Sequence, residues 1–172
     1  MTPDRGRGLS RASRALAVLL LSMSPIACYE SELPLSPSGQ VKVDPALIGT
    51  WKCTPDPPKS TDVAELRVVA FDEHQYYLEW QEGADTDRYR AYASRVDGST
   101  LLNVRELFAT ASDVKWVFLR SRLDPPARLR LSLVQKSALA GLDAKNALKT
   151  IVRRVRDENL YEPWAVCSRV GA

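Results

Sequence analysis

Short runs in which apolar and polar residues alternate, each ended by Gly, Pro or Asp, constrain the fold of this chain most strongly. Successive side chains of a strand point to opposite faces, so such a run predicts a half-buried strand. The clearest run places Leu129, Leu131 and Leu133 on one face and polar residues on the other. The predicted strands are Leu47–Thr54, Val63–Phe71, Gln75–Gln81, Asp87–Val96, Thr100–Leu107, Val114–Leu123, Arg128–Val134 and Trp164–Val170.

The connections between these strands are short, and Asp97-Gly98 is a strong hairpin-turn signal. One segment changes period: apolar residues recur three and four apart over 144–155, which predicts an amphipathic helix capped by Asp143. Strands joined in this way form an antiparallel meander, and eight of them can close a barrel without an exposed edge. We therefore predict a mainly β barrel domain over 46–172, with the helix before the last strand.

The first 27 residues have the layout of a secretory signal. An arginine-rich segment precedes the apolar run Ala15–Leu21, and small residues end at Ala27. The run is too short to span a bilayer as a helix, which takes about 20 residues. We predict that residues 1–27 are removed as a signal peptide and that the protein reaches the cell envelope.

The residues at the predicted cleavage site, Ser24-Pro25-Ile26-Ala27-Cys28, resemble the lipobox of bacterial lipoproteins, with Pro25 where a leucine-like residue is usual. The resemblance implies that Cys28 becomes the first residue and carries acyl chains, such as palmitate, that anchor the protein to a membrane. Tyr29 follows where an Asp would suggest inner-membrane retention, so the resemblance implies an outer-membrane anchor, facing periplasm or cell surface. The alternative is a plain secreted protein cut near Ala27.

Residues 28–45 are rich in Pro, Ser and charge and lack any period, which predicts a flexible tether. The whole chain has 24 basic and 21 acidic residues, of which four arginines and one aspartate lie in 1–27, so the remainder carries 20 of each. A formally neutral domain has no overall field that would attract nucleic acid. We therefore expect no nucleic-acid partner.

The chain has three cysteines, and an odd number leaves one without a partner in a secreted protein. Lipid on Cys28 would leave Cys53 and Cys167 as a pair, and an exported domain meets conditions in which disulfides form. Because the pair lies in the first and last predicted strands, a bond between them would join the two ends of the sheet. The alternative is two buried thiols.

Gly49-Thr50-Trp51, at the start of the first strand, resembles the Gly-x-Trp opening of lipocalins. In that family the Trp closes the base of the barrel and a late basic residue packs over it. The resemblance implies that Trp51 and Arg169 form this pair. It also implies a lipocalin-like barrel that binds a small ligand.

Aromatic residues on the strands are candidates for lining such a cavity. The candidates are Trp51, Tyr76, Trp80, Trp116 and Phe118. The alternative is that they fill a solid core, which favours a protein-interaction or inhibitor module of the envelope. An inward Arg67 or Arg120 without an acid beside it would indicate an anionic ligand.

Signals for catalysis are weak. The one histidine, His74, lies in a polar turn without a nucleophile in a suitable context, and the sequence has no metal-binding or phosphate-binding motif. We expect a binding module without catalytic residues, metal or cofactor, whose partners are a membrane and a small apolar ligand or envelope protein. A carboxylate-dependent hydrolase is the weaker alternative, with candidates Glu65, Glu79, Asp85, Asp87 and Glu106.

Overall fold

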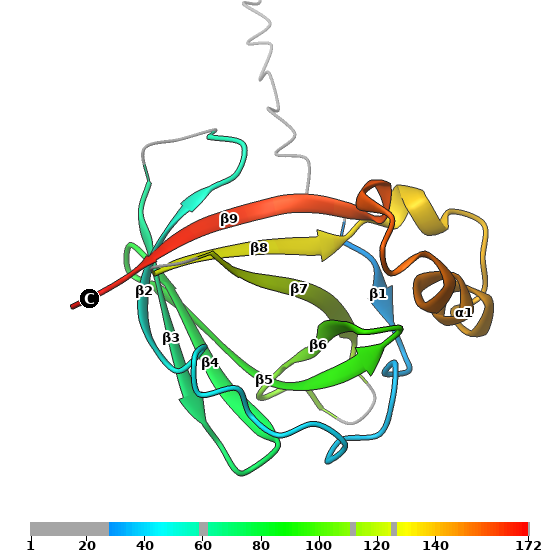
Figure 1. Cartoon of the computed structure of the whole chain (residues 1–172), viewed down its shortest axis with the longest axis horizontal. Coiled ribbons are helices and arrows are strands. Elements are labelled where there is room, and N and C mark those ends of the chain that lie inside the picture. The colour runs from blue at the N-terminus through cyan, green and yellow to red at the C-terminus, as the bar shows by residue number, and fades with distance from the viewer. Residues whose placement is uncertain (1–27, 59–61, 111–112, 125–126, 172) are drawn as a thin grey trace, which may run out of the picture.

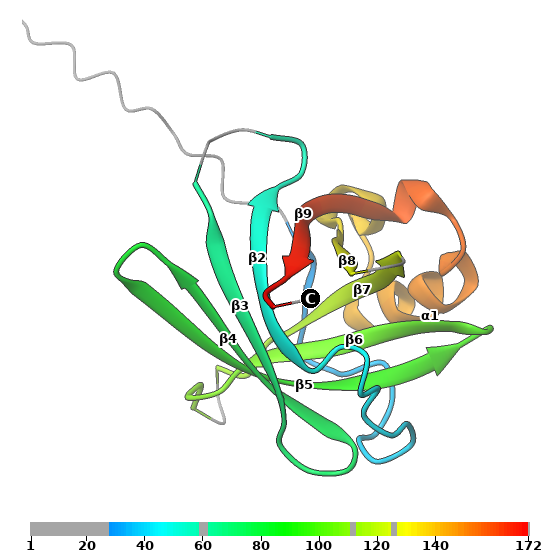
Figure 2. The ribbon, with the colours of Figure 1, turned by 60° about the vertical axis from the view of Figure 1, so that its left-hand side comes forward.

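The computed structural model describes residues 28–58, 62–110, 113–124 and 127–171, in which eight antiparallel strands form a closed barrel (Figures 1 and 2). The strands are β2 (Gly49–Pro55), β3 (Ala64–Ala70), β4 (Gln75–Glu82), β5 (Asp85–Val96), β6 (Ser99–Glu106), β7 (Trp116–Asp124), β8 (Arg128–Val134) and β9 (Tyr161–Arg169). Neighbours in the chain are neighbours in the sheet, and β9 also pairs with β2, which closes the barrel. The predicted fold class is confirmed. The predicted signal peptide lies outside the described residues.

An up-and-down barrel has two ends, and the chain connections alternate between them. The connections that follow β2, β4, β6 and β8 lie at one end, which we call the mouth end, and the other turns lie at the base end. The base-end turn between β5 and β6 is the predicted two-residue hairpin, with positive φ at Asp97 (45°) and Gly98 (76°). Such a turn matches the right-handed twist of the strands that it joins.

The predicted helix, α1 (Ala144–Arg154), lies between β8 and β9, flanked by the single turns η1 (Lys136–Leu139) and η2 (Glu158–Leu160). Asp143 caps it as predicted, because its carboxylate accepts a hydrogen bond from the backbone N–H of Asn146 at 2.9 Å. No helix among the described residues is long and apolar enough to cross a bilayer.

Two apolar cores lie on opposite faces of the barrel wall. The first lies inside the barrel and includes Trp51, Leu102 and Leu129. The second lies outside, where Ile151 of α1 packs in the cluster that contains Phe118 of β7. Strands β6 and β7 are therefore apolar on both faces, as a strand covered on both sides must be.

Residues 28–45 differ from the predicted flexible tether, because they pack along the barrel. The short strand β1 (Glu30–Ser31) pairs with the beginning of β7. Further on, the backbone N–H of Leu35 donates to the buried side chain of Asn103 at 2.8 Å, and the Tyr92 hydroxyl donates to the carbonyl oxygen of Ser36 at 2.6 Å. Its apolar residues are divided between the two cores, with Val43 packed on the inner one and Tyr29 on the outer one, so the segment has no single apolar face and no periodic pattern.

The two ends of the sheet meet through a disulfide. Cys53 and Cys167 face each other in the register between β2 and β9, and their sulfurs are 2.03 Å apart. The predicted bond is confirmed, and the alternative of two buried thiols is wrong. The bond joins residues 114 positions apart in the chain.

At the base end, the guanidinium carbon of Arg169 lies 4.4 Å from the centre of the fully buried Trp51 ring. The Trp51 indole N–H donates to the carbonyl oxygen of Leu47 at 3.0 Å. Arg169 donates to the carbonyl oxygen of Ile48 at 2.7 Å and also to that of Ala46. Arg169 thus ties the segment before β2 to the last strand.

Gly49 leaves the space that Arg169 occupies. Its φ is +140°, and a Cβ at this position would lie 2.8 Å from a guanidinium nitrogen of Arg169. We predict that Gly49→Ala lowers the free energy of unfolding by roughly 1–3 kcal/mol, because it combines an unfavourable backbone conformation with a clash. Chemical denaturation measures this, with Gly39→Ala as the control, since Gly39 also has positive φ but open space around it. Equal losses in the two variants would contradict the role of Arg169.

Arg120 is buried on the outer face of β7, and Glu158 of η2 neutralises it. Two hydrogen bonds of 3.1 and 2.6 Å join the guanidinium to the carboxylate, and the guanidinium also lies 3.7 Å from the centre of the Tyr161 ring. Because Arg120 has this acid beside it, it does not indicate an anionic ligand. Arg67 is exposed on the outer face of β3 and does not point inward.

Arg120 and Arg122 hold the pKa of the Glu158 carboxyl below its usual value by donating hydrogen bonds to it. A carboxyl whose pKa is lower in the folded state stabilises the fold when the pH is above its pKa in the unfolded state, which is about 4.3 for Glu. This stabilisation is lost as the pH falls through the pKa of the folded state. We predict that Glu158→Gln costs about 1–2 kcal/mol at pH 7, a modest loss because Glu158 itself is exposed. Urea unfolding across pH should show the difference from wild type shrinking below about pH 4. A difference independent of pH would contradict the ion pair.

Candidate ligand cavity

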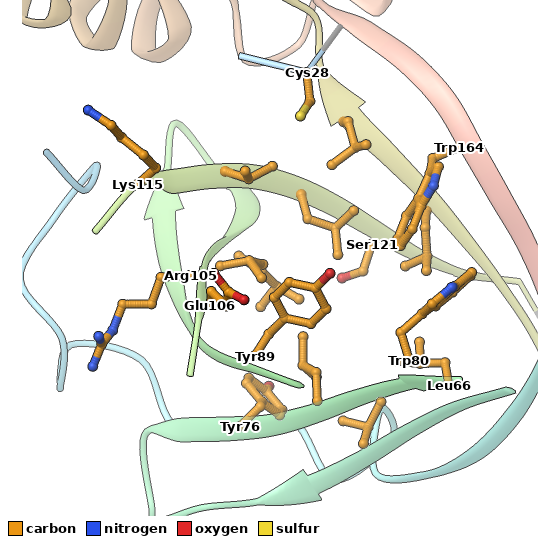
Figure 3. A pocket seen from close by; sticks show the side chains of 18 of the residues that line it. Cys28, Leu66, Tyr76, Trp80, Tyr89, Arg105, Glu106, Lys115, Ser121 and Trp164 are labelled. Atoms are coloured by element: carbon orange, nitrogen blue, oxygen red, sulfur yellow. The ribbon is translucent and has the colours of Figure 1, made fainter. Parts of the chain in front are cut away.

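The barrel interior contains an apolar cavity of about 530 Å3, whose lining extends into the connection between β6 and β7 at the mouth end (Figure 3). Its aliphatic wall comes from inward residues of β3, β4, β6, β7 and β8. These residues are Leu66, Val68, Leu78, Leu102, Val104, Val117, Leu119, Leu129, Leu131 and Leu133. Each strand contributes every second residue, which is how a β-barrel lines its interior. A cavity of this volume is in the range of small-molecule sites.

Aromatic side chains form one side of the cavity near the mouth end. The rings of Trp80 and Trp164 stack with their centres 4.5 Å apart. The Tyr89 ring projects into the cavity with its hydroxyl directed toward Ser121 (Figure 3). Burial, together with the carboxylates of Asp87 and Glu106, raises the pKa of Tyr89 to about 12. The phenol therefore stays neutral and presents a single polar atom inside an apolar space.

Charged residues are confined to the rim. Arg105 and Lys115 contribute to the lining, but their charged ends point away from the cavity centre (Figure 3). The Lys115 ammonium pairs with Glu32 at 3.1 Å. Glu30, Glu106 and Asp113 complete the rim. The arrangement suits a ligand with an apolar body and a polar end.

Cys28 lies at the edge of the same cavity and is a free thiol (Figure 3). Its backbone forms an isolated antiparallel β-bridge with Gln135, the residue that follows β8. Burial, followed by the negative charge of Glu30, raises the pKa of the Cys28 thiol. The thiol therefore lies in a largely apolar environment at the mouth end.

Two of the five predicted cavity residues, Tyr76 and Trp80, line the cavity. The other three lie elsewhere among the described residues: Trp51 fills the base under Arg169, and Trp116 and Phe118 face outward into the core beneath α1. The prediction failed for β7 because this strand is apolar on both faces.

Tyr89, Trp164 and the aliphatic wall also line the cavity, and of these Tyr89 and the wall follow from strand alternation. Tyr89 lies opposite Leu78 in the register between β4 and β5. Since the Leu78 side chain points into the barrel, the Tyr89 side chain does so too. Trp164 precedes Ala165 in β9 and breaks the alternation, because the register between β8 and β9 shifts at Leu131/Ser132. Only a known strand pairing could have revealed that shift.

The weak catalytic candidates are scattered. His74 lies in the base-end turn between β3 and β4, where its backbone N–H donates to Asp72 at 2.7 Å. Of the five carboxylates named as hydrolase candidates, only Glu106 belongs to the cavity lining. Within the described ranges, no three His, Cys, Asp or Glu side chains cluster in a way that could hold a metal ion.

Comparisons with protein-family models, with curated proteins and with solved structures find no match for this chain.

Proposed function

We propose that this protein is a non-enzymatic bacterial lipoprotein of the cell envelope, anchored through lipid on Cys28, whose barrel binds a small apolar or amphipathic ligand. The single observation that carries the proposal is the apolar cavity of about 530 Å3 with a charged rim. Each methylene that a ligand buries there contributes roughly 0.8 kcal/mol, so a lipid-like chain supplies enough free energy for binding without any ion pair.

The position of Cys28 supports the anchor. Cys28 lies at the mouth end, two residues before Glu30, where β1 begins and pairs with β7. Phe108 and Val63, which are 75% and 55% exposed, lie in the mouth-end connections after β6 and β2. Lipid on Cys28 would therefore bring the mouth end and these apolar side chains close to the membrane surface.

The base of the barrel supports the lipocalin-like assignment. Trp51 is buried under Arg169, Gly49 makes room for the guanidinium, and the barrel has eight strands. Lipocalin-like barrels use their interiors for small apolar ligands, which agrees with the cavity.

A fluorescent fatty acid tests the ligand proposal directly. We predict 1:1 binding with a Kd in the micromolar range, about −8 kcal/mol, to the Cys28→Ser protein. Val104→Trp should weaken binding by roughly tenfold or more, because the indole occupies space beside Tyr89 and Val117. The matched control is Val69→Trp, the same substitution on the outer face of β3. Absence of binding to the Cys28→Ser protein would reject the ligand proposal and favour an interaction module instead.

A further inference from the structure

We infer that one acyl chain on Cys28 folds back into the barrel, so that the protein's own lipid is the resident ligand of the cavity. The inference rests on the proposed lipidation of Cys28 and deepens the proposed function by naming the occupant. It predicts that the lipidated protein is closed to free ligands, whereas the unlipidated protein is open to them.

The direction of the Cys28 side chain carries the inference. Residues 28–31 are held in the barrel wall: Cys28 bridges Gln135, the Tyr29 N–H donates to the carbonyl oxygen of Val134 at 2.9 Å, and Glu30 pairs with Val117. Successive side chains of such a segment point to opposite faces. Tyr29 faces outward and stacks on Phe118, with ring centres 6.2 Å apart. Its neighbours Cys28 and Glu30 both line the cavity.

The sulfur of Cys28 points from the wall toward the cavity interior (Figure 3). A substituent on this sulfur continues the direction of the side chain. Below the sulfur lies the Tyr89 ring, and the stacked rings of Trp80 and Trp164 form the adjacent side of the space, where they offer apolar contact (Figure 3). An alkyl chain on Cys28 therefore starts at the entrance and meets apolar side chains along its path.

The cavity volume is sufficient for one long alkyl chain. A methylene is close in size to a water molecule, whose share of liquid volume is about 30 Å3, so a chain of about 16 carbons occupies on the order of 500 Å3. The cavity measures about 530 Å3. A second chain on the same cysteine would remain outside, where it can enter the bilayer and keep the protein anchored.

The attachment chemistry is an ordinary substitution at sulfur. A phospholipid donates its diacylglyceryl group: a carbon–sulfur bond forms at Cys28, the bond from that carbon to the phosphate oxygen breaks, and the thiol proton leaves with the released head group. No oxidant or reductant is needed.

Tethering makes the bound chain a strong competitor. A short tether holds its ligand at an effective concentration in the millimolar range. Against a free fatty acid that binds with a micromolar Kd, this lowers the apparent affinity by roughly a thousandfold. A shift of a hundredfold or more is therefore expected when Cys28 carries a long chain.

The test uses the purified full chain, in which Cys28 is converted at alkaline pH to a mixed disulfide by a hexadecyl or a methyl methanethiosulfonate. The Cys28 thiolate forms a sulfur–sulfur bond to the alkylthio group and displaces methanesulfinate. Alkaline conditions are required because burial raises the pKa of this thiol. The first readout is the affinity for a fluorescent fatty acid. The second is quenching of Trp80 and Trp164 by a bromine-bearing hexadecyl chain, with Trp80→Phe plus Trp164→Phe as the control for assignment. Cys28→Ser controls for labelling elsewhere.

A hundredfold loss of fatty-acid affinity with the hexadecyl chain but not with the methyl group supports the inference, as does quenching that disappears in the double Trp variant. When the unmodified protein binds the fatty acid, equal affinity of both derivatives overturns the inference. Absence of quenching overturns it in every case. If the unmodified protein binds no free fatty acid but the tethered chain quenches, the inference stands and only the binding of external ligands fails. The mass of the protein isolated from bacterial membranes checks lipidation separately, and a chain without acyl mass overturns the inference together with the anchor.

Discussion

Removal of the disulfide by Cys53→Ala together with Cys167→Ala should lower the free energy of unfolding by about 4 kcal/mol. The bond closes a loop of 114 positions between β2 and β9, and the chain-entropy model gives a loop of this length about 4–5 kcal/mol. Without the bond, the unfolded chain is no longer closed into this loop and gains conformational entropy, which stabilises it relative to the folded barrel. Guanidinium unfolding monitored by circular dichroism measures the difference.

Wild-type protein in reductant should behave like the double variant, since both lack the bond. Cys28→Ser, which removes the free thiol, should leave stability nearly unchanged. A loss below about 1 kcal/mol in the double variant would contradict the expected constraint of the bond on the unfolded chain.

Replacing Trp51 with alanine should destabilise the protein by about 3–5 kcal/mol, the usual cost of truncating a fully buried Trp. The substitution removes the largest side chain of the inner core, the hydrogen bond to Leu47 and the surface on which Arg169 lies. Urea unfolding measures the change, provided that the variant is kept oxidised.

Trp51→Phe is the matched control, because it retains most of the packing and loses mainly the indole hydrogen bond. Its expected cost is about 1–2 kcal/mol. We expect Arg169→Ala to cost the same free energy of unfolding in the Trp51→Phe background as in wild type, and to cost nothing further in the Trp51→Ala background. This pattern would show that Arg169 stabilises the fold through its contact with the aromatic ring at position 51. Complete additivity of Trp51→Ala and Arg169→Ala would contradict the base as described.

The sequence was sufficient to predict the strands and their order because each strand has at least one apolar face. In β8 the alternation of Leu129, Leu131 and Leu133 with polar residues is unambiguous, and these leucines line the cavity. The hairpin at Asp97-Gly98 and the cap at Asp143 were also predictable, since both depend on local conformation alone. The disulfide followed from the number of cysteines and from their positions in the first and last strands.

The candidate cavity could be predicted only in part, because strands covered on both sides carry two apolar faces. In β7, Trp116 and Phe118 on one face and Val117 and Leu119 on the other are equally plausible interior residues by composition. The outcome depends on α1, whose Ile151 packs in the outer cluster. Periodicity within one strand cannot report which face a distant helix covers.

The packing of residues 28–45 was unpredictable for a different reason. Its apolar residues are divided between two cores, and it also forms individual hydrogen bonds to buried polar groups, such as those of Ser36 to Ser94 and of Leu35 to Asn103. Buried polar groups require partners, so Asn103 and Ser94 did need a covering segment. Their burial, however, becomes apparent only once the fold is known.

Native mass spectrometry of the Cys28→Ser protein, purified from bacteria without added lipid, tests the hollow barrel most directly. We predict a chain mass two hydrogens below that of the fully reduced protein, because Cys53 and Cys167 are bonded. We also predict that this chain retains, or takes up on addition, one molecule of the size of a fatty acid. Val104→Trp should reduce the fraction of protein that carries this added mass, whereas Val69→Trp should not. A folded, oxidised protein that carries no such mass and takes up no added fatty acid would contradict the account.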